Sequence, residues 1–136
     1  MKAHCFALLV HDRPDPLDLL KSVLKELYVE TYSVRNCEEA KRLIPQTQPQ
    51  LVFTDTVLPD GSWTDVIELA ENASSPVNVI VVGTIKDINF YLTALERGAF
   101  DFVLPPFERD SLDFIVQSAA QDARLRRQAQ ARVAIA

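Results

Sequence analysis

Glycine is scarce in this sequence, with three residues among 136. Neither of the glycine-rich phosphate loops, GxGxxG and GxxxxGK[ST], is present, and this argues against a nucleotide-binding enzyme. Cysteine is scarce as well. Cys5 and Cys37 lie far apart without metal-site spacing, and we interpret them as reduced thiols of a cytoplasmic protein.

Long apolar runs are also missing. The apolar start FALLV (6–10) is too short for a secretory signal and is followed at once by His11 and Asp12, so we expect neither a targeting nor a membrane segment. The net charge of −5 argues against binding to nucleic acid or to an anionic membrane. The length suits one domain with a single sizeable core.

Five short apolar runs are present and predict β-strands: 4–10, 29–35, 50–55, 77–83 and 101–104. The first, third and fourth are almost continuously apolar or β-branched, which is typical of strands covered on both faces. The second, VETYSVR, alternates polar and apolar residues and so predicts an edge strand.

Segments with helical period separate the runs: 14–28, 37–46, 62–73, 86–99, and a last helix from about residue 110. Ser62 is the expected N-cap of the third, with Asp65 three residues on. We expect Pro45 to end the second and Gly98 to end the fourth. In the fourth segment the period places four residues inward: Ile88, Tyr91, Leu92 and Leu95.

Strands that alternate with helices five times predict an α/β fold with a parallel sheet and helices on both faces. Ligands of such sheets bind outside the carboxyl ends of the strands. Isolated polar or turn-forming residues follow four of the predicted strands at those ends: His11, Asp12, Asp55, Gly83, Thr84 and Pro105.

Three stretches carry a family resemblance: LLVHDRPDPLDLL (8–20), LVFTDTVLPDGSW (51–63) and ALERGAFDFVLPPF (94–107). Through them, residues 4 to about 123 resemble the receiver domains of two-component response regulators, whose fold is that of CheY. The resemblance implies a flavodoxin-like (βα)5 fold with strand order 2-1-3-4-5, a receiver domain over 1–123, and a helical extension or linker over 124–136. It implies a regulatory protein of phosphorelay signalling, not an enzyme.

The resemblance assigns the phosphoacceptor role to Asp55. Receivers hold Mg²⁺ between that aspartate, an acidic pair after the first strand, and one backbone carbonyl, here that of Val57. Asp12 matches the pair, but His11 does not, and imidazole is a poor ligand for a hard cation. We therefore expect weak Mg²⁺ binding and no other cofactor.

Two further positions of the family pattern differ. The phosphate-binding hydroxyl falls on Gly83, with Thr84 one residue beyond and so pointing to the opposite face. The lysine falls on Pro105, which carries no cation, and the resemblance implies a cis bond after it. The nearest cations in the sequence, Lys86 and Arg109, lie in other loops. Impaired phosphorylation chemistry is the resulting expectation.

The expected output surface includes Phe102, at the position of the family's switch aromatic, with a plain core residue as the alternative. Phe90 and Phe114 fall outside the inward stripes of their helices, which suggests an apolar partner or homodimer face on the fourth and fifth helices, with two unrelated exposed rings as the alternative. The expected partner is a sensor histidine kinase or another signalling protein. The alternative function is a phosphorylation-independent interaction module, a pseudo-receiver, and a third class, a small flavodoxin-like enzyme, has little support.

Overall fold

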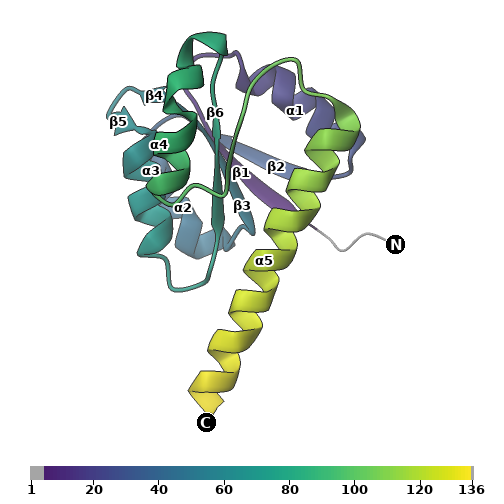
Figure 1. The fold of residues 1–136 in the computed structure, drawn as a ribbon. Coiled ribbons are helices and arrows are strands. Elements are labelled where there is room, and N and C mark those ends of the chain that lie inside the picture. The colour runs from purple at the N-terminus through teal and green to yellow at the C-terminus, as the bar shows by residue number, and fades with distance from the viewer. Residues whose placement is uncertain (1–4, 136) are drawn as a thin grey trace.

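The computed structural model describes residues 5–135. Its elements, in chain order, are β1 (Phe6–Val10), α1 (Leu17–Glu26), β2 (Glu30–Val34), α2 (Cys37–Thr47), β3 (Leu51–Asp55), β4 (Val57–Leu58), β5 (Gly61–Ser62), α3 (Trp63–Glu71), β6 (Asn78–Val82), the 3₁₀ helix η1 (Ile85–Phe90), α4 (Tyr91–Glu96), β7 (Asp101–Val103) and α5 (Arg109–Ile135). Figure 1 shows helices on both sides of one central sheet.

The central sheet has five parallel strands in the order β2-β1-β3-β6-β7. This confirms the predicted flavodoxin-like (βα)5 fold with strand order 2-1-3-4-5, because β6 and β7 are the fourth and fifth strands of this sheet. The alternating strand β2 lies at one edge, as predicted. The short antiparallel pair β4–β5, which the sequence analysis did not predict, follows β3.

Each face of the sheet is covered by its own apolar cluster, because successive strand residues point to opposite faces. Ala7 and Leu9 of β1 pack with α1 and α5, whereas Leu8 and Val10 pack with α2, α3 and α4. Phe53 of β3 is fully buried on the α1–α5 side. The strand that ends on Asp55 is therefore covered on both faces.

Two helix ends agree with the predicted caps, and one does not. Ser62 and Asp65 form a capping box at the start of α3. Gly98 has the positive φ of 108° that favours glycine after a helix end. The prediction that Pro45 ends the second helix is wrong, since α2 continues to Thr47; a proline in the last turn removes only one hydrogen bond.

The fourth helical segment differs from the prediction. It begins as η1 and continues as the short helix α4, and Leu92 is 67% exposed while Ala94 is buried. Because a 3₁₀ turn has 3.0 residues instead of 3.6, the face that meets the sheet is rotated relative to a continuous α-helix. The predicted inward positions Ile88 and Tyr91 are accordingly partly exposed.

Helix α5 has 27 residues and is about 40 Å long, and its C-terminal half projects beyond the sheet (Figure 1). Arg126 donates to the side-chain oxygen of Asn78, and Arg127 donates to the carbonyls of Pro76 and Pro49. These bonds connect the C-terminal half of α5 to the start of β6 and to the loops before β3 and β6. Within residues 5–135, every helix is too short or too polar to cross a lipid bilayer.

Candidate functional site

The carboxyl ends of four strands meet at one edge of the sheet. Val10 pairs with Thr54, Asp55 with Val82, and Val82 with Val103. The loops that follow β1, β3, β6 and β7 therefore emerge side by side, which is where parallel α/β sheets place their ligand sites. All the predicted site residues except the helix phenylalanines lie on or beside these strand ends.

Asp55 is fully buried, and both of its carboxylate oxygens accept hydrogen bonds. Arg13 donates from Nε to Oδ2 at 2.7 Å and from Nη2 to Oδ1 at 2.9 Å. The backbone N–H of Thr56 also donates to Oδ1, at 2.7 Å. This bidentate arrangement is the geometry in which arginine and carboxylate interact most strongly.

Arg13 is the residue of this site that the sequence analysis missed. Its side chain is 52% exposed, whereas the carboxylate that it contacts is fully buried. The hydrogen bond to Asp55 raises the pKa of Arg13, and the charges of Asp55 and Asp87 add to that shift. Arg13 follows β1 by three residues, and β1 pairs with β3, so its position in the sequence was the available signal.

His11 and Asp12 have other partners. The Nδ1 of His11 lies 2.9 Å from the carbonyl oxygen of Arg13, and its Nε2 lies 3.4 Å from the hydroxyl of Ser33. Asp12 forms an ion pair with Arg35, with 3.6 Å between Oδ1 and Nε. Neither residue is hydrogen-bonded to Asp55 in the described part of the chain.

Thr84 and Gly83 follow β6. Thr84 forms a capping box with Asp87: its backbone N–H donates to Oδ2 at 2.9 Å and its hydroxyl donates to the same oxygen at 3.2 Å. Gly83 donates its N–H to the carbonyl of Val103, which keeps it in line with the sheet. The hydroxyl of Thr84 is thus bonded to Asp87.

Pro105 follows β7 and is half-buried at the same edge of the sheet. The bond between Pro105 and Pro106 is cis, as the sequence analysis expected. The side chain of Pro105 offers neither a positive charge nor a hydrogen-bond donor.

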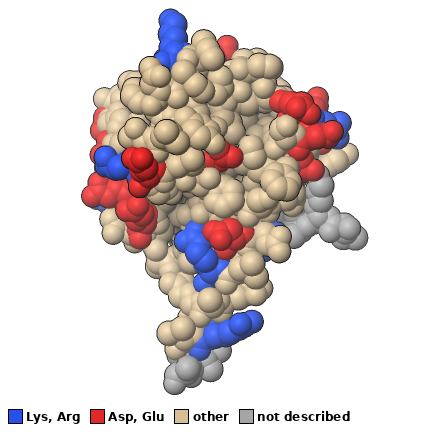
Figure 2. All heavy atoms as spheres, in the orientation of Figure 1, with Lys and Arg blue, Asp and Glu red and all other residues tan. Residues whose placement is uncertain are grey.

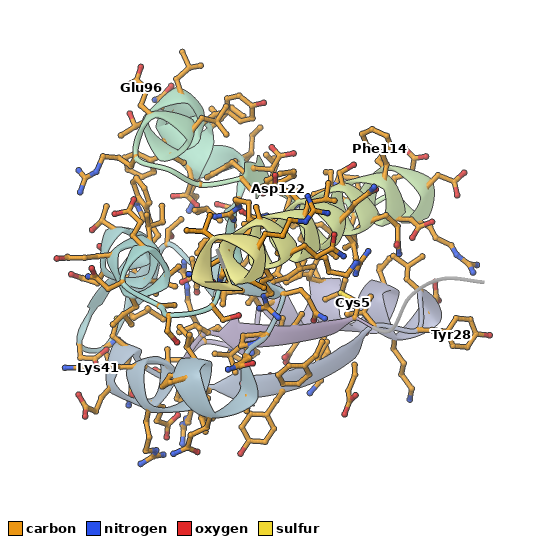
Figure 3. The ribbon with its side chains drawn as sticks, turned by 90° about the horizontal axis from the view of Figure 1, so that it is seen from below. Cys5, Tyr28, Lys41, Glu96, Phe114 and Asp122 are labelled. Atoms are coloured by element: carbon orange, nitrogen blue, oxygen red, sulfur yellow. The ribbon has the colours of Figure 1, made fainter. Side chains whose placement is uncertain are left out.

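The three aromatic residues of the predicted output surface differ in exposure. Phe102 is buried, 4% exposed, and its ring meets that of Tyr91 edge to face with 6.1 Å between the centroids. Phe90 and Phe114 are 43% and 74% exposed, and Figure 3 shows Phe114 pointing away from the sheet. Their predicted outward orientation is present; their role as a contact surface stays a prediction.

The receiver resemblance implies Mg²⁺ at this edge, and the described residues do not fit it. Among residues 5–135, no three side chains of the His, Cys, Asp and Glu types are grouped to hold a metal ion. Both oxygens of Asp55 face Arg13, and Asp12 faces Arg35. Val57, whose carbonyl the resemblance names as a ligand, is the exposed first residue of strand β4.

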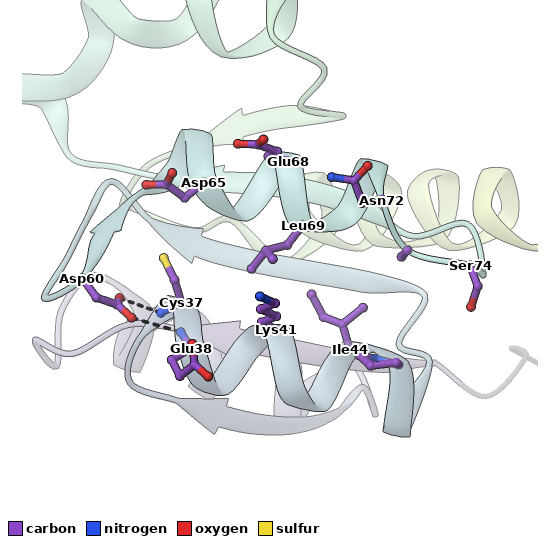
Figure 4. A pocket seen from close by; sticks show the side chains of 12 residues that line it. Cys37, Glu38, Lys41, Ile44, Asp60, Asp65, Glu68, Leu69, Asn72 and Ser74 are labelled. Carbon is purple, nitrogen blue, oxygen red and sulfur yellow. Dashed lines mark hydrogen bonds between the residues drawn. The ribbon is translucent and has the colours of Figure 1, made fainter.

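A hollow of about 670 Å³ lies elsewhere, between α2 and α3 (Figure 4). Asp60 lies at one end of it and accepts hydrogen bonds from the N–H groups of Cys37 and Glu38. Those N–H groups belong to the first turn of α2, where a carboxylate is favoured. The hollow therefore has a structural carboxylate at one end and none of the residues of the Asp55 site.

Comparison with known proteins identifies the kind of domain. The family model described as "Response regulator receiver domain" matches residues 7–117. The response regulator protein PilR of Pseudomonas aeruginosa is 33% identical over 113 residues, which cover 83% of this chain and 25% of PilR. The nitrogen assimilation regulatory protein NtrX of Azorhizobium caulinodans is 32% identical over 124 residues, covering 89% of this chain and 27% of NtrX.

Among solved structures, the receiver domain of NtrX from Brucella abortus superimposes with a TM-score of 0.73 at 26% identity, covering 85% of this chain and 98% of that one. The chain spans about a quarter of the length of the two curated relatives named above.

Proposed function

The chain belongs to the response regulator receiver domain family, and from this premise we propose that it acts in cytoplasmic phosphorelay signalling with impaired phosphorylation chemistry. The observation that carries the proposal is the pair of residues that follow β6 and β7. The resemblance to receivers assigns to Gly83 and Pro105 the positions of two groups that bind phosphate, and neither side chain can supply such a group.

Asp55 is the proposed phosphoacceptor, because it is the acid at the end of the central strand β3. Transfer of a phosphoryl group to a carboxylate needs cations and donors around the transferred oxygens. The hydroxyl of Thr84 is bonded to Asp87, and Pro105 brings no charge. Of the groups that the family uses, Asp12 and Asp55 remain, and each is already paired with an arginine.

The alternative is a phosphorylation-independent interaction module. It is favoured by the exposed apolar side chains near β7: Ile85, Phe90, Leu92 and Phe114. Figure 2 shows that the upper central part of the molecule, over η1 and the start of α4, carries few charged side chains. We propose the exposed apolar surface on η1, α4 and α5 as the contact with a sensor kinase, another signalling protein or a second copy of the chain.

The phosphorylation proposal is tested by mass spectrometry after incubation with acetyl phosphate and Mg²⁺. A Mg²⁺ concentration of about 10 mM would saturate a hard-cation site of moderate affinity. We expect no stable phosphate adduct on the wild-type chain, with a phosphorylatable receiver run alongside as the positive control. A Mg²⁺-dependent adduct that disappears in Asp55→Asn would contradict impaired chemistry.

Sedimentation velocity tests the contact surface. If α4 and α5 form a homodimer face, Phe90→Ser and Phe114→Ser should each lower the fraction of dimer, since each removes an exposed ring from it. Monomeric behaviour of the wild type and of both variants at high concentration would rule out the homodimer and leave a different partner protein as the occupant of the surface.

A further inference from the structure

The positive charge beside Asp55 comes from the chain itself. Arg13 contacts both carboxylate oxygens, at 2.7 and 2.9 Å, and the carboxylate is fully buried. A buried carboxylate is costly unless a cation or donors accompany it. Arg13 and the N–H of Thr56 meet that need within residues 5–135 without any bound ion.

The contacts of Arg13 overlap with those that a metal would require. A divalent cation at this edge would have to bind an oxygen of Asp55, and each of those oxygens already accepts a bond from the guanidinium. Nη2 of Arg13 also lies 3.4 Å from the hydroxyl of Thr56, so the guanidinium lies across the end of β3. The guanidinium therefore competes with a divalent cation for the space and the negative charge next to both oxygens of Asp55.

We propose that Arg13 is a resident counter-ion that replaces the divalent cation at Asp55 and restricts access of metal to the site. This inference rests on the proposed function, because it names what regulates the same carboxylate. Half of the Arg13 side chain is exposed, so the guanidinium can move into solvent without disturbing the buried core.

Metal binding then depends on the small fraction of molecules in which Arg13 points away. The apparent dissociation constant rises in inverse proportion to that fraction. Minor states of this kind are populated at about 0.1–10%. Removal of the guanidinium should therefore tighten metal binding about tenfold or more.

Titration with MgCl₂ and MnCl₂ tests the proposal in the wild type, Arg13→Ala and Arg13→Gln. Binding is measured by calorimetry and by the fluorescence of Trp63, whose backbone N–H donates to the carbonyl of Thr56, next to Asp55. Lys86→Ala is the matched control. Lys86 is an exposed cation beside the same edge of the sheet, and its side chain is not among the hydrogen-bond partners of Asp55 in the described residues. We expect about tenfold tighter binding in both Arg13 variants than in Lys86→Ala, and loss of that gain when Asp55→Asn is added.

Equal affinity in the Arg13 variants and in Lys86→Ala would overturn the proposal, as would a gain that persists in Asp55→Asn. Two neutral replacements guard against a folding defect in one of them, and thermal unfolding of each is recorded first. The outcome is separable from that of the proposed function. Metal binding without a phosphate adduct in Arg13→Ala supports both, whereas a phosphate adduct on the wild type contradicts impaired chemistry whichever way the metal titration turns out.

Discussion

Replacing Gly83 by alanine tests how the ring of Phe102 is held. A Cβ at position 83 would lie 2.7 Å from Cζ of Phe102 and 3.0 Å from both Cβ and Oδ2 of Asp87. Carbon atoms do not approach within 2.7 Å, so either the ring or the β6–η1 loop has to shift. The backbone of Gly83 is outside the positive-φ region, so the effect would come from crowding alone.

The magnitude follows from what must move. Forcing a methyl group into a packed site costs typically about 1–3 kcal/mol. Displacement of Phe102 would also weaken its edge-to-face contact with Tyr91, a type of pair that contributes about 0.5–1.5 kcal/mol. An unstrained glycine-to-alanine change would instead stabilise by about 0.4–1 kcal/mol, through the unfolded chain. We expect a net loss of about 1–2 kcal/mol, and a fall in Tm of about 3–8 °C for a domain of this size.

The assay is urea unfolding of the wild type, Gly83→Ala, Phe102→Leu and the double variant, followed by circular dichroism. Leucine lacks the distal ring atom that the new Cβ would meet, so Gly83→Ala should cost at least about 1 kcal/mol less in the Phe102→Leu background. The same cost in both backgrounds would refute the steric argument. So would a Gly83→Ala variant that is more stable than the wild type.

Two further predictions concern hydrogen bonds at helix ends. The N–H of Cys37 lowers the pKa of Asp60, with desolvation opposing and the N–H of Glu38 assisting the shift. Because the folded-state pKa is depressed, the stability that Asp60 provides is present above its ordinary pKa and is lost as the pH falls through the folded value. The difference in urea midpoint between the wild type and Asp60→Asn should therefore shrink between about pH 5 and pH 2; an unchanged difference over that range would contradict it. On α5, Arg127→Ala should speed amide hydrogen exchange of residues 124–132 about fivefold, as expected for a loss of about 1 kcal/mol. Replacing the exposed Arg132 by alanine should not change the exchange rate. Equal exchange in the two variants would show that the bonds to Pro76 and Pro49 do not hold the helix.

The central sheet was predictable because its signal is local. Runs such as VNVIVVG (77–83) are apolar or β-branched at nearly every position, and only a strand covered on both faces accommodates them. Alternation in VETYSVR placed that strand at an edge, where β2 lies. The capping box of Ser62 and Asp65 was equally local, since both partners lie within one helical turn.

The fourth helical segment shows where a periodic pattern misleads. Ile88, Tyr91 and Leu92 fit an inward α-helical stripe, but the bonds from Thr84 to Asp87 start a 3₁₀ turn before it. The tighter turn changes which residues face the sheet, and Ala94 becomes the buried one. Hydrophobic periodicity does not distinguish a segment that begins as a 3₁₀ helix from a continuous α-helix, so the predicted inward stripe was wrong.

The position of Arg13 was missed for a different reason. The cations nearest in the sequence to the ends of β6 and β7 are Lys86 and Arg109, and these were the candidate replacements for the charge absent at Pro105. Arg13 lies in the loop after β1, and the pairing of Val10 with Thr54 brings that loop beside Asp55. The contact depends on the direction in which a loop leaves the sheet, and this is set by tertiary packing instead of by residue type.

The polar groups at this edge of the sheet are satisfied by one another, and this bears on how the domain can signal. Asp55 is paired with Arg13, Asp12 with Arg35, and the hydroxyl of Thr84 with Asp87. An incoming phosphoryl group or metal would have to break at least the first of these pairs before making any new contact. A ligand shifts the equilibrium between two conformations only by the difference between its affinities for them. Here the free energy needed to break these pairs would be subtracted from the binding free energy of the phosphoryl group or metal. We therefore expect a partner protein that binds the exposed apolar surface of η1, α4 and α5 to influence this domain more strongly than phosphorylation does, because binding there does not require the Arg13–Asp55 pair to break.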